Sequence, residues 1–237
     1  MREFIDKLSA SVIEIVYIAP HLDDAALGAG ATLRSIAKLG RDVSVVTVFC
    51  GEPDGIQNNV QERKKEDLLA CKELGITATH LGFLDAIYRR DKYGKHIYPY
   101  LSAVVEEPAK EDTLLSELGY ALSSFLKEKV VIVPAGRSRH VDHQILRKVC
   151  DEYLEPFAYY DDLPYFARSS IALVSFNPNM PENAVSVQVD EDALKAKIRA
   201  VKKYMSQLEF LFGSNDEVGN IITAYLNSTG GEVHWIK

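Results

Sequence analysis

The sequence lacks the features of a secreted, disulfide-rich or membrane-inserted protein. Its three cysteines, Cys50, Cys71 and Cys150, are far apart and odd in number, so no disulfide framework is expected and a reducing compartment is the simpler interpretation. No apolar run approaches the length of a membrane span. The N-terminal residues also lack the apolar core of a signal peptide. We therefore expect a cytoplasmic protein with no membrane insertion.

The chain also lacks a basic run, internal repeats, low-complexity segments and linkers. Its net charge of -7 argues against nucleic acid as the main partner. With 47% hydrophobic residues, a chain of 237 residues can bury a full core, and α/β folds of this length are commonly undivided. We expect one domain over residues 1–237 and leave open whether copies of it form a homo-oligomer.

Strand-like and helix-like patterns alternate along the first two thirds of the chain. The predicted strands are 12–19, 43–49, 80–84 and 130–133, and the predicted helices are 25–39, 61–74 and 112–128. This alternation predicts an α/β, Rossmann-like, doubly wound and mostly parallel sheet with helices on both faces.

The C-terminal third of the chain has a mixed pattern and is predicted to add short strands and helices. The predicted strands are near 157–160, 171–176 and 185–189. One predicted helix follows His143 and ends at about 154, and two more cover 191–212 and 216–226.

Polar clusters follow two of the predicted strands. His21, Asp23 and Asp24 lie between the first strand and its helix, and His140 and His143 follow the strand at 130–133. Ligands bind at such strand-to-helix junctions in α/β proteins. His21, Asp24 and His143 would meet if the two strand ends are neighbours, and two imidazoles with one carboxylate suit a catalytic Zn²⁺.

Asp23 and His140 are left over from this ligand set. A spare carboxylate and a spare imidazole are what general base and general acid catalysis require. Either cluster alone is also compatible with plain helix capping, because Asp is favoured at helix N-termini.

With these clusters the sequence resembles the PIG-L or LmbE-like family of zinc-dependent N-deacetylases, which act on N-acetylglucosaminyl compounds. The motif 20–24, Pro-His-Leu-Asp-Asp, is similar to the family's Pro-His-Pro-Asp-Asp, and 140–143, His-Val-Asp-His, is similar to its His-Pro-Asp-His. Supporting likenesses are the Gly-Ala-Gly-Ala-Thr stretch at 28–32, Arg63 and Glu66 in a helix, Leu-Gly-Phe-Leu-Asp at 81–85 and Tyr-Asp-Asp-Leu-Pro-Tyr at 160–165.

The resemblance implies a role for each of these residues. The zinc ligands would be His21, Asp24 and His143, and the catalytic residues would be Asp23 as general base, His140 as general acid and Asp142 orienting an imidazole. Arg63 and Asp85 would contact substrate hydroxyls. The implied reaction removes the acetyl group from a small-molecule N-acetylated sugar or sugar conjugate, and the protonated form of His140 would help to stabilise the oxyanion.

Other functions stay open from the sequence. A metal-dependent hydrolase of another bond, such as the amide of a thiol conjugate or a phosphoester, is one alternative, because paired aspartates also suit magnesium. The imidazoles argue against magnesium, which prefers oxygen ligands. The other alternative is a non-catalytic sugar-binding protein. The segment 88–100 mixes tyrosines with basic residues, among them Arg89 and Arg90. One hypothesis is a substrate-facing lid that attracts anionic substrates, and the alternative is an exposed connection or a subunit contact.

Overall fold

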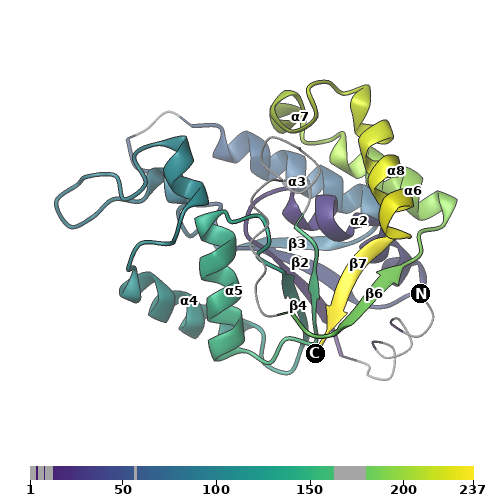
Figure 1. The fold of residues 1–237 in the computed structure, drawn as a ribbon, viewed down its shortest axis with the longest axis horizontal. Helices are drawn as coiled ribbons and strands as arrows, with labels where there is room; N and C mark the ends of the chain where they lie inside the picture. The colour runs from purple at the N-terminus through teal and green to yellow at the C-terminus, as the bar shows by residue number, and fades with distance from the viewer. Residues whose placement is uncertain (1–3, 5–7, 9–12, 56–57, 163–179) are drawn as a thin grey trace.

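The protein is built around a seven-stranded sheet (Figure 1). The computed structural model describes residues 4, 8, 13–55, 58–162 and 180–237. The strands, in the sheet order β3-β2-β1-β4-β5-β7-β6, are Thr77–His80, Val43–Thr47, Ile15–Ala19, Val130–Pro134, Ala158–Tyr160, Glu232–Ile236 and Asn183–Val187. Strands β1 to β5 are parallel, whereas β7 is antiparallel to both β5 and β6. The predicted mostly parallel α/β sheet is therefore confirmed.

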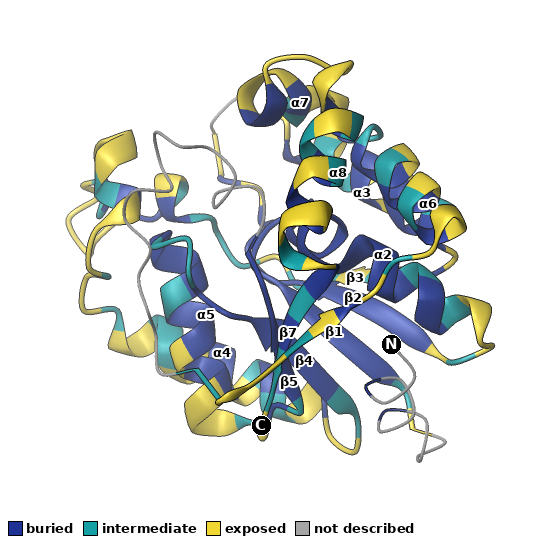
Figure 2. Ribbon diagram, turned by 45° about the vertical axis from the view of Figure 1, so that its right-hand side comes forward, coloured by how far each residue is buried: buried dark blue, intermediate teal, exposed yellow. Residues whose placement is uncertain are grey.

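Helices cover both faces of the sheet (Figures 1 and 2). One face carries α2 (Asp24–Lys38), α3 (Val60–Leu74) and α6 (Glu191–Val201), and the other carries α4 (Asp112–Phe125) and α5 (Val141–Tyr153). Side chains of β1 alternate between these layers: Ile15 and Tyr17 pack with α2 and α6, whereas Val16 and Ile18 pack with α4 and α5. Because both faces of β1 are buried, its sequence is apolar at every position.

The strand order reverses at β1. The chain runs outward from β1 to β2 and β3, then returns so that β4 pairs with the opposite side of β1, with Ile15 opposite Val130. The segment after β1 leads to α2 on one face of the sheet, whereas the segment after the neighbouring strand β4 leads to α5 on the other face. Open α/β sheets bind ligands at such a switch point.

One strand was predicted at the wrong place. Instead of 80–84, β3 covers Thr77–His80 and pairs with β2 from Ser44 to Thr47. The ladder ends at His80, and Gly82, two residues later, has a φ of 84° in the left-handed region. Glycine adopts that conformation at little cost. The apolar side chains beyond it pack from a loop.

The prediction of one long helix over 191–212 was also wrong. The structure has two helices, α6 and α7 (Met205–Phe212), with a turn between them. In the turn Tyr204 is buried and donates to the Asp67 carboxylate at 2.7 Å. Glu66 accepts from the backbone N–H of Ser206 at 2.8 Å. Tertiary hydrogen bonds to α3 thus break a helix that no proline or glycine interrupts.

The remaining C-terminal predictions had mixed outcomes. The helix predicted over 216–226 is present as α8 (Glu217–Thr229). The strand at 171–176 lies outside the described residues. Strand β7 was not predicted, because its inward-facing Glu232 and His234 are polar, yet both are fully buried. Among the residues that the structure describes, every helix is too short or too polar to cross a lipid bilayer.

Candidate functional site

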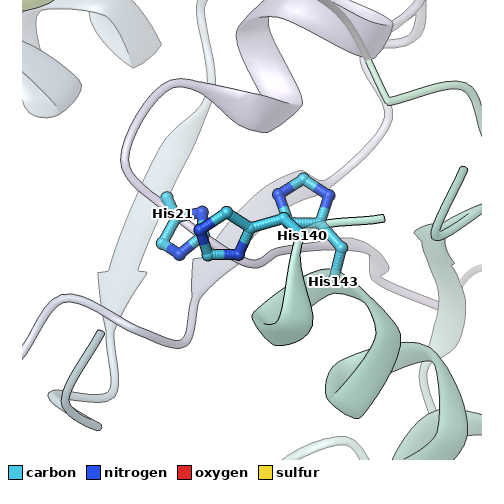
Figure 3. Close-up of side chains that lie close together, drawn as sticks. All are labelled: His21, His140 and His143. Carbon is cyan, nitrogen blue, oxygen red and sulfur yellow. The ribbon is translucent and has the colours of Figure 1, made fainter. Parts of the chain in front are cut away.

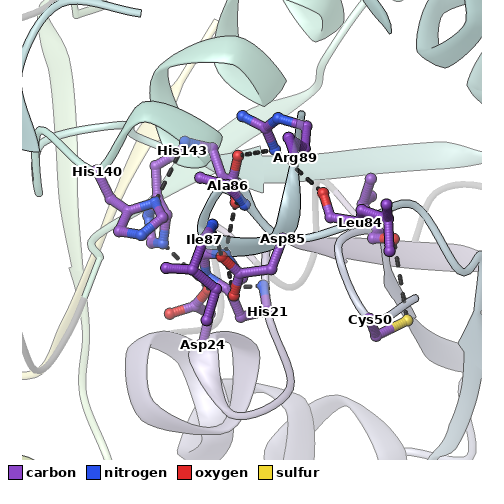
Figure 4. A network of polar contacts seen from close by, with 12 residues as sticks. His21, Asp24, Cys50, Leu84, Asp85, Ala86, Ile87, Arg89, His140 and His143 are labelled. Atoms are coloured by element: carbon purple, nitrogen blue, oxygen red, sulfur yellow. Dashed lines mark hydrogen bonds and ion pairs between the residues drawn. The ribbon is translucent and has the colours of Figure 1, made fainter. Parts of the chain in front are cut away.

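Three of the predicted site residues meet at the carboxyl ends of β1 and β4 (Figure 4). His21 follows β1, Asp24 is the first residue of α2, and His143 lies in the first turn of α5. Oδ2 of Asp24 lies 3.3 Å from Nδ1 of His21 and 3.2 Å from Nε2 of His143. It also accepts the backbone N–H of His21 at 2.8 Å. The tertiary structure thus brings two imidazoles and one carboxylate oxygen together.

A second carboxylate lies behind each imidazole. Nε2 of His21 donates to Oδ2 of Asp142 at 3.0 Å, and Nδ1 of His143 donates to Oδ2 of Asp162 at 2.9 Å. These bonds fix both rings, so that Nδ1 of His21 and Nε2 of His143 face Asp24. Histidines that bind metals are commonly held in this way by an outer carboxylate.

The cluster fits a zinc ion. Ligand atoms bonded at about 2.0 to 2.1 Å in a tetrahedron lie roughly 3.3 Å apart, and the two distances from Oδ2 of Asp24 match this spacing. The other carboxylate oxygen of Asp24 is buried and has no hydrogen-bond partner among the described atoms. A buried carboxylate oxygen without a partner is costly, and a cation would satisfy it.

His140 also lies next to this cluster (Figure 3). Ring nitrogens of His21, His140 and His143 lie within 4.8 Å of one another. A second group within the same distance consists of nitrogens of His21 and His140 with carboxylate oxygens of Asp85 and Asp142. Nδ1 of His140 accepts the backbone N–H of Asp142 at 3.2 Å, so the proton of the neutral ring is on Nε2 and neither nitrogen has a free lone pair for a metal. We therefore favour Asp24 over His140 as the third ligand. Through the same hydrogen bond, His140 is the N-cap of α5.

Electrostatic interactions make the cluster favourable for positive charge. Burial lowers the pKa of His143, but the carboxylates of Asp24 and Asp162 more than compensate and raise it to about 9. Burial likewise opposes the charge of His21, while Asp85, Asp142 and Asp24 raise its pKa well above the ordinary value. A divalent cation would exploit the same carboxylates, with neutral imidazoles as ligands.

Asp23 has an environment suited to accepting a proton. Its carboxyl is buried, and this burial is the main reason that its pKa rises to about 7. Oδ2 of Asp23 lies 3.7 Å from Nη2 of Arg63, a residue of α3, whose charge acts in the opposite direction. The backbone of Asp23 has a φ of 124°, a conformation that costs a non-glycine residue about 1 to 3 kcal/mol.

The surroundings of His140 favour its neutral form. Burial first, and then the positive charge of His21, lowers the pKa of His140 to about 3. Since Nδ1 accepts the Asp142 N–H, the proton of the neutral ring is on Nε2. His140 can therefore donate a hydrogen bond near the cluster, but the surroundings do not favour the protonated acid expected from the sequence.

Asp85 lies beside the cluster rather than apart from it. It precedes the short helix η1 (Ala86–Tyr88), where its side chain accepts the N–H of Ile87 at 3.1 Å. Its Oδ2 is 3.6 Å from Nε2 of His21. The side chain remains partly exposed.

The expectation that Arg89 faces the substrate was wrong. Arg89 is buried and its Nη1 donates to Oδ1 of Asp142 at 2.5 Å (Figure 4). Its neighbour Arg90 is exposed and donates to the carbonyl oxygen of Gly94. The lid stays a prediction for the exposed residues of the segment 88–100, and Arg89 belongs to the interior of the site.

Sequence reasoning missed Asp162 as part of the site. Asp162 is the second residue after β5, the strand next to β4. Its carboxylate accepts from His143 and from the backbone N–H of Gly136 at 3.0 Å. The signal was available: Asp161 and Asp162 form a third polar cluster at the end of a parallel strand.

The comparisons with known proteins agree with this geometry. The family model described as PIG-L: GlcNAc-PI de-N-acetylase matches residues 16–154. This range contains all of the predicted site residues. A comparison with curated proteins found no match.

Solved structures of deacetylases are similar to nearly the whole chain. The zinc-inhibited form of the teicoplanin deacetylase Orf2 is 25% identical with a TM-score of 0.79, covering 94% of this chain and 97% of the other. The A40926 pseudoaglycone deacetylase Dbv21 is 25% identical with a TM-score of 0.75, covering 95% and 97%. The N,N'-diacetylchitobiose deacetylase of Pyrococcus horikoshii shares the fold. It is 15% identical with a TM-score of 0.60, covering 99% of this chain and 88% of the other.

Proposed function

The chain belongs to the PIG-L family of GlcNAc-PI de-N-acetylases, and from this premise we propose that it is a zinc-dependent hydrolase. It removes the N-acetyl group from an N-acetylglucosamine-type amino sugar. The observation that carries this proposal is the buried cluster of His21, Asp24 and His143, with Asp23 and His140 beside it. Deacetylases among the similar structures support the reaction type.

The ligand set consists of Nδ1 of His21, the carboxylate of Asp24 and Nε2 of His143. A zinc ion held there would supply a nucleophilic water at neutral pH and polarise the acetamide carbonyl. The opposite nitrogens of both rings are engaged by Asp142 and Asp162, so the donor atoms are oriented before the ion arrives.

Asp23 is the general base in this proposal. With a pKa of about 7, its carboxylate is basic enough to take a proton from water and acidic enough to return it. Water adds to the acetyl carbon, the C–N bond then breaks, and acetate and a free amine are the products. Because the surroundings keep His140 neutral, Asp23 is the group that carries the proton to the leaving nitrogen.

His140 stabilises the negative charge that develops on the carbonyl oxygen. Its Nε2–H is directed by the N-cap hydrogen bond of Nδ1, so the ring needs no reorganisation during the reaction. A preorganised donor of this kind contributes about 2.7 to 4 kcal/mol to an acyl-transfer transition state.

Arg63 and Asp85 contact hydroxyl groups of the sugar ring. Arg63 comes from α3 and lies beside Asp23, whereas Asp85 comes from the loop after β3 and lies beside His21. The names of the similar proteins, which include a chitobiose and a teicoplanin deacetylase, support a sugar-type substrate.

The proposal is tested by measuring acetate and amine release from a panel of N-acetyl amino sugars. Zinc-loaded protein should release both products in equal amounts, and protein treated with a chelator should release neither until zinc is added back. An aryl phosphodiester in the same panel serves as the test for a phosphoesterase. Cleavage of the phosphodiester without acetate release would contradict the proposal, as would zinc-independent release.

A further inference from the structure

Arg89 is enclosed in the interior of the site. Its guanidinium carbon lies 5.4 Å from the ring centroid of Phe49 and 5.3 Å from that of Tyr98. Nη1 donates to the carbonyl oxygen of Leu84 at 3.1 Å as well as to Asp142. Hydrogen bonds donated by Nη1 and Nη2 restrict the orientation of this buried guanidinium.

Arg89 is two hydrogen bonds away from the metal cluster. Oδ1 of Asp142 accepts from Arg89, whereas Oδ2 accepts from His21 and from the backbone N–H of Ala86 at 2.9 Å. The two oxygens of one fully buried carboxylate therefore have separate tasks. The bond on Oδ1 determines the plane of the carboxylate, and that plane determines where Oδ2 meets the imidazole of His21.

The other side of Arg89 is held by Glu111. Nε of Arg89 lies 2.8 Å from Oε2 of Glu111, and Nη2 donates to Oε1 at 3.1 Å. Tyr98 donates to the same Oε1 at 2.7 Å. Only Nη2 donates a hydrogen bond in this ion pair, because Nε lies near Oε2 without the geometry to donate. The ion pair ties Asp142 to the segment before α4, which contributes no residue to the proposed ligand set.

We propose that Arg89 is a positioning residue of the metal centre, which acts through Asp142 to hold Nδ1 of His21 toward the ion. The proposal rests on the proposed function only for the identity of the metal ligands. Lysine would keep the charge but not the fork, so it could not serve Asp142 and Glu111 together. Loss of the orienting carboxylate of a metal-bound histidine typically costs 10- to 100-fold in metal affinity or activity, and loss of Arg89 should cost a similar factor.

The test compares Arg89→Ala, Arg89→Lys and the control Arg90→Ala on the full chain. Zinc affinity is measured by competition with a chromophoric chelator, and the visible absorption of the cobalt-substituted protein reports the ligand geometry. We expect R89A and R89K to bind zinc about 10- to 100-fold more weakly, with an altered cobalt spectrum. R90A should bind zinc like the wild type, because the Arg90 side chain is exposed and donates to the carbonyl oxygen of Gly94 in its own loop.

Rescue by a small molecule separates positioning from loss of fold. Methylguanidinium can fill the space that R89A leaves and should restore part of the zinc affinity and of kcat, with KM little changed. Thermal unfolding in excess chelator monitors the fold of each variant. If R89A does not fold, the proposal is decided by R89K, which retains the stem and the charge.

Two results would overturn the proposal. One is wild-type zinc affinity and an unchanged cobalt spectrum in a folded R89A or R89K variant. The other is a wild-type protein that binds no zinc, which would overturn the ligand assignment as well. A wild-type protein that binds zinc but deacetylates no substrate would refute the proposed reaction alone, because the affinity measurements on Arg89 need no turnover.

Discussion

Oδ2 of Asp162 lies 2.9 Å from Nδ1 of His143, and both residues are buried. This contact joins the segment after β5 to the first turn of α5 behind the proposed metal cluster. It is the counterpart of the contact between Asp142 and His21 on the opposite side.

Replacing Asp162 by Asn should weaken zinc binding about 10- to 100-fold while the protein stays folded. The amide keeps one acceptor oxygen for the backbone N–H of Gly136 but presents an NH₂ group to the histidine. Chelator competition measures the affinity. Asp161→Asn is the matched control, because that side chain bonds to Arg137 and Tyr225 instead. Equal zinc affinities in the two variants would contradict the assignment.

Asp23→Asn should keep zinc and lose nearly all turnover. The change removes a proton acceptor and leaves the proposed ligands in place, and general base catalysis typically contributes 100- to 10,000-fold. Metal analysis checks that zinc is retained, and product release from the same preparation checks that turnover is lost. Loss of zinc from D23N would instead make Asp23 a ligand.

His140→Gln should also retain zinc and lower kcat by about 100- to 1,000-fold. The variant loses an Nε2–H donor that faces the cluster, while the three ligands stay. Steady-state kinetics on the zinc-loaded protein provide the measurement. Near-normal kcat would show that His140 only caps α5.

Activity should fall in acid because Asp23 must be ionised to accept a proton. Burial raises the pKa of this carboxyl to about 7 in the metal-free protein. The charge of a bound cation lowers the pKa, so the acidic limb of kcat in the zinc-loaded protein lies below pH 7. Arg63 lowers this pKa. Arg63→Gln removes the positive charge, so the pKa of Asp23 rises and the limb shifts to higher pH. A pH profile whose limb does not move would exclude Asp23 as the titrating base.

The Lys197–Glu232 ion pair, which lies outside the proposed metal cluster, should contribute strongly to the free energy of unfolding. Both side chains are fully buried and their charged atoms lie 2.5 Å apart. Glu232 also accepts the N–H groups of Ala31 and Thr32. Lys197→Met leaves this carboxylate uncompensated and should cost about 3 to 5 kcal/mol in urea unfolding. Lys195→Met removes an exposed pair with Glu191 and should change the free energy of unfolding by less than about 1 kcal/mol.

Local sequence patterns were enough for most of the parallel part of the fold, with β3 as the exception. Apolar runs such as 43–49 become buried parallel strands, and helices such as α3 end at a glycine, Gly75, in the left-handed conformation. Predictions failed where a distant contact competes with the local preference. The helix over 191–212 breaks because Tyr204 and Ser206 bond to α3, and no feature of their own segment encodes those partners.

The sequence by itself determined which residue types follow β1 and β4, and hence that two imidazoles and a carboxylate would meet once these strands became neighbours. Only the tertiary structure decided which nitrogen of each ring faces Asp24, because that choice depends on Asp142 and Asp162. The orienting carboxylate of His21 is 121 positions away in the chain. Arg89 was misassigned for the same reason: charge patterning describes a segment, whereas burial against Phe49, Tyr98 and Asp142 depends on elements that meet only in the folded protein.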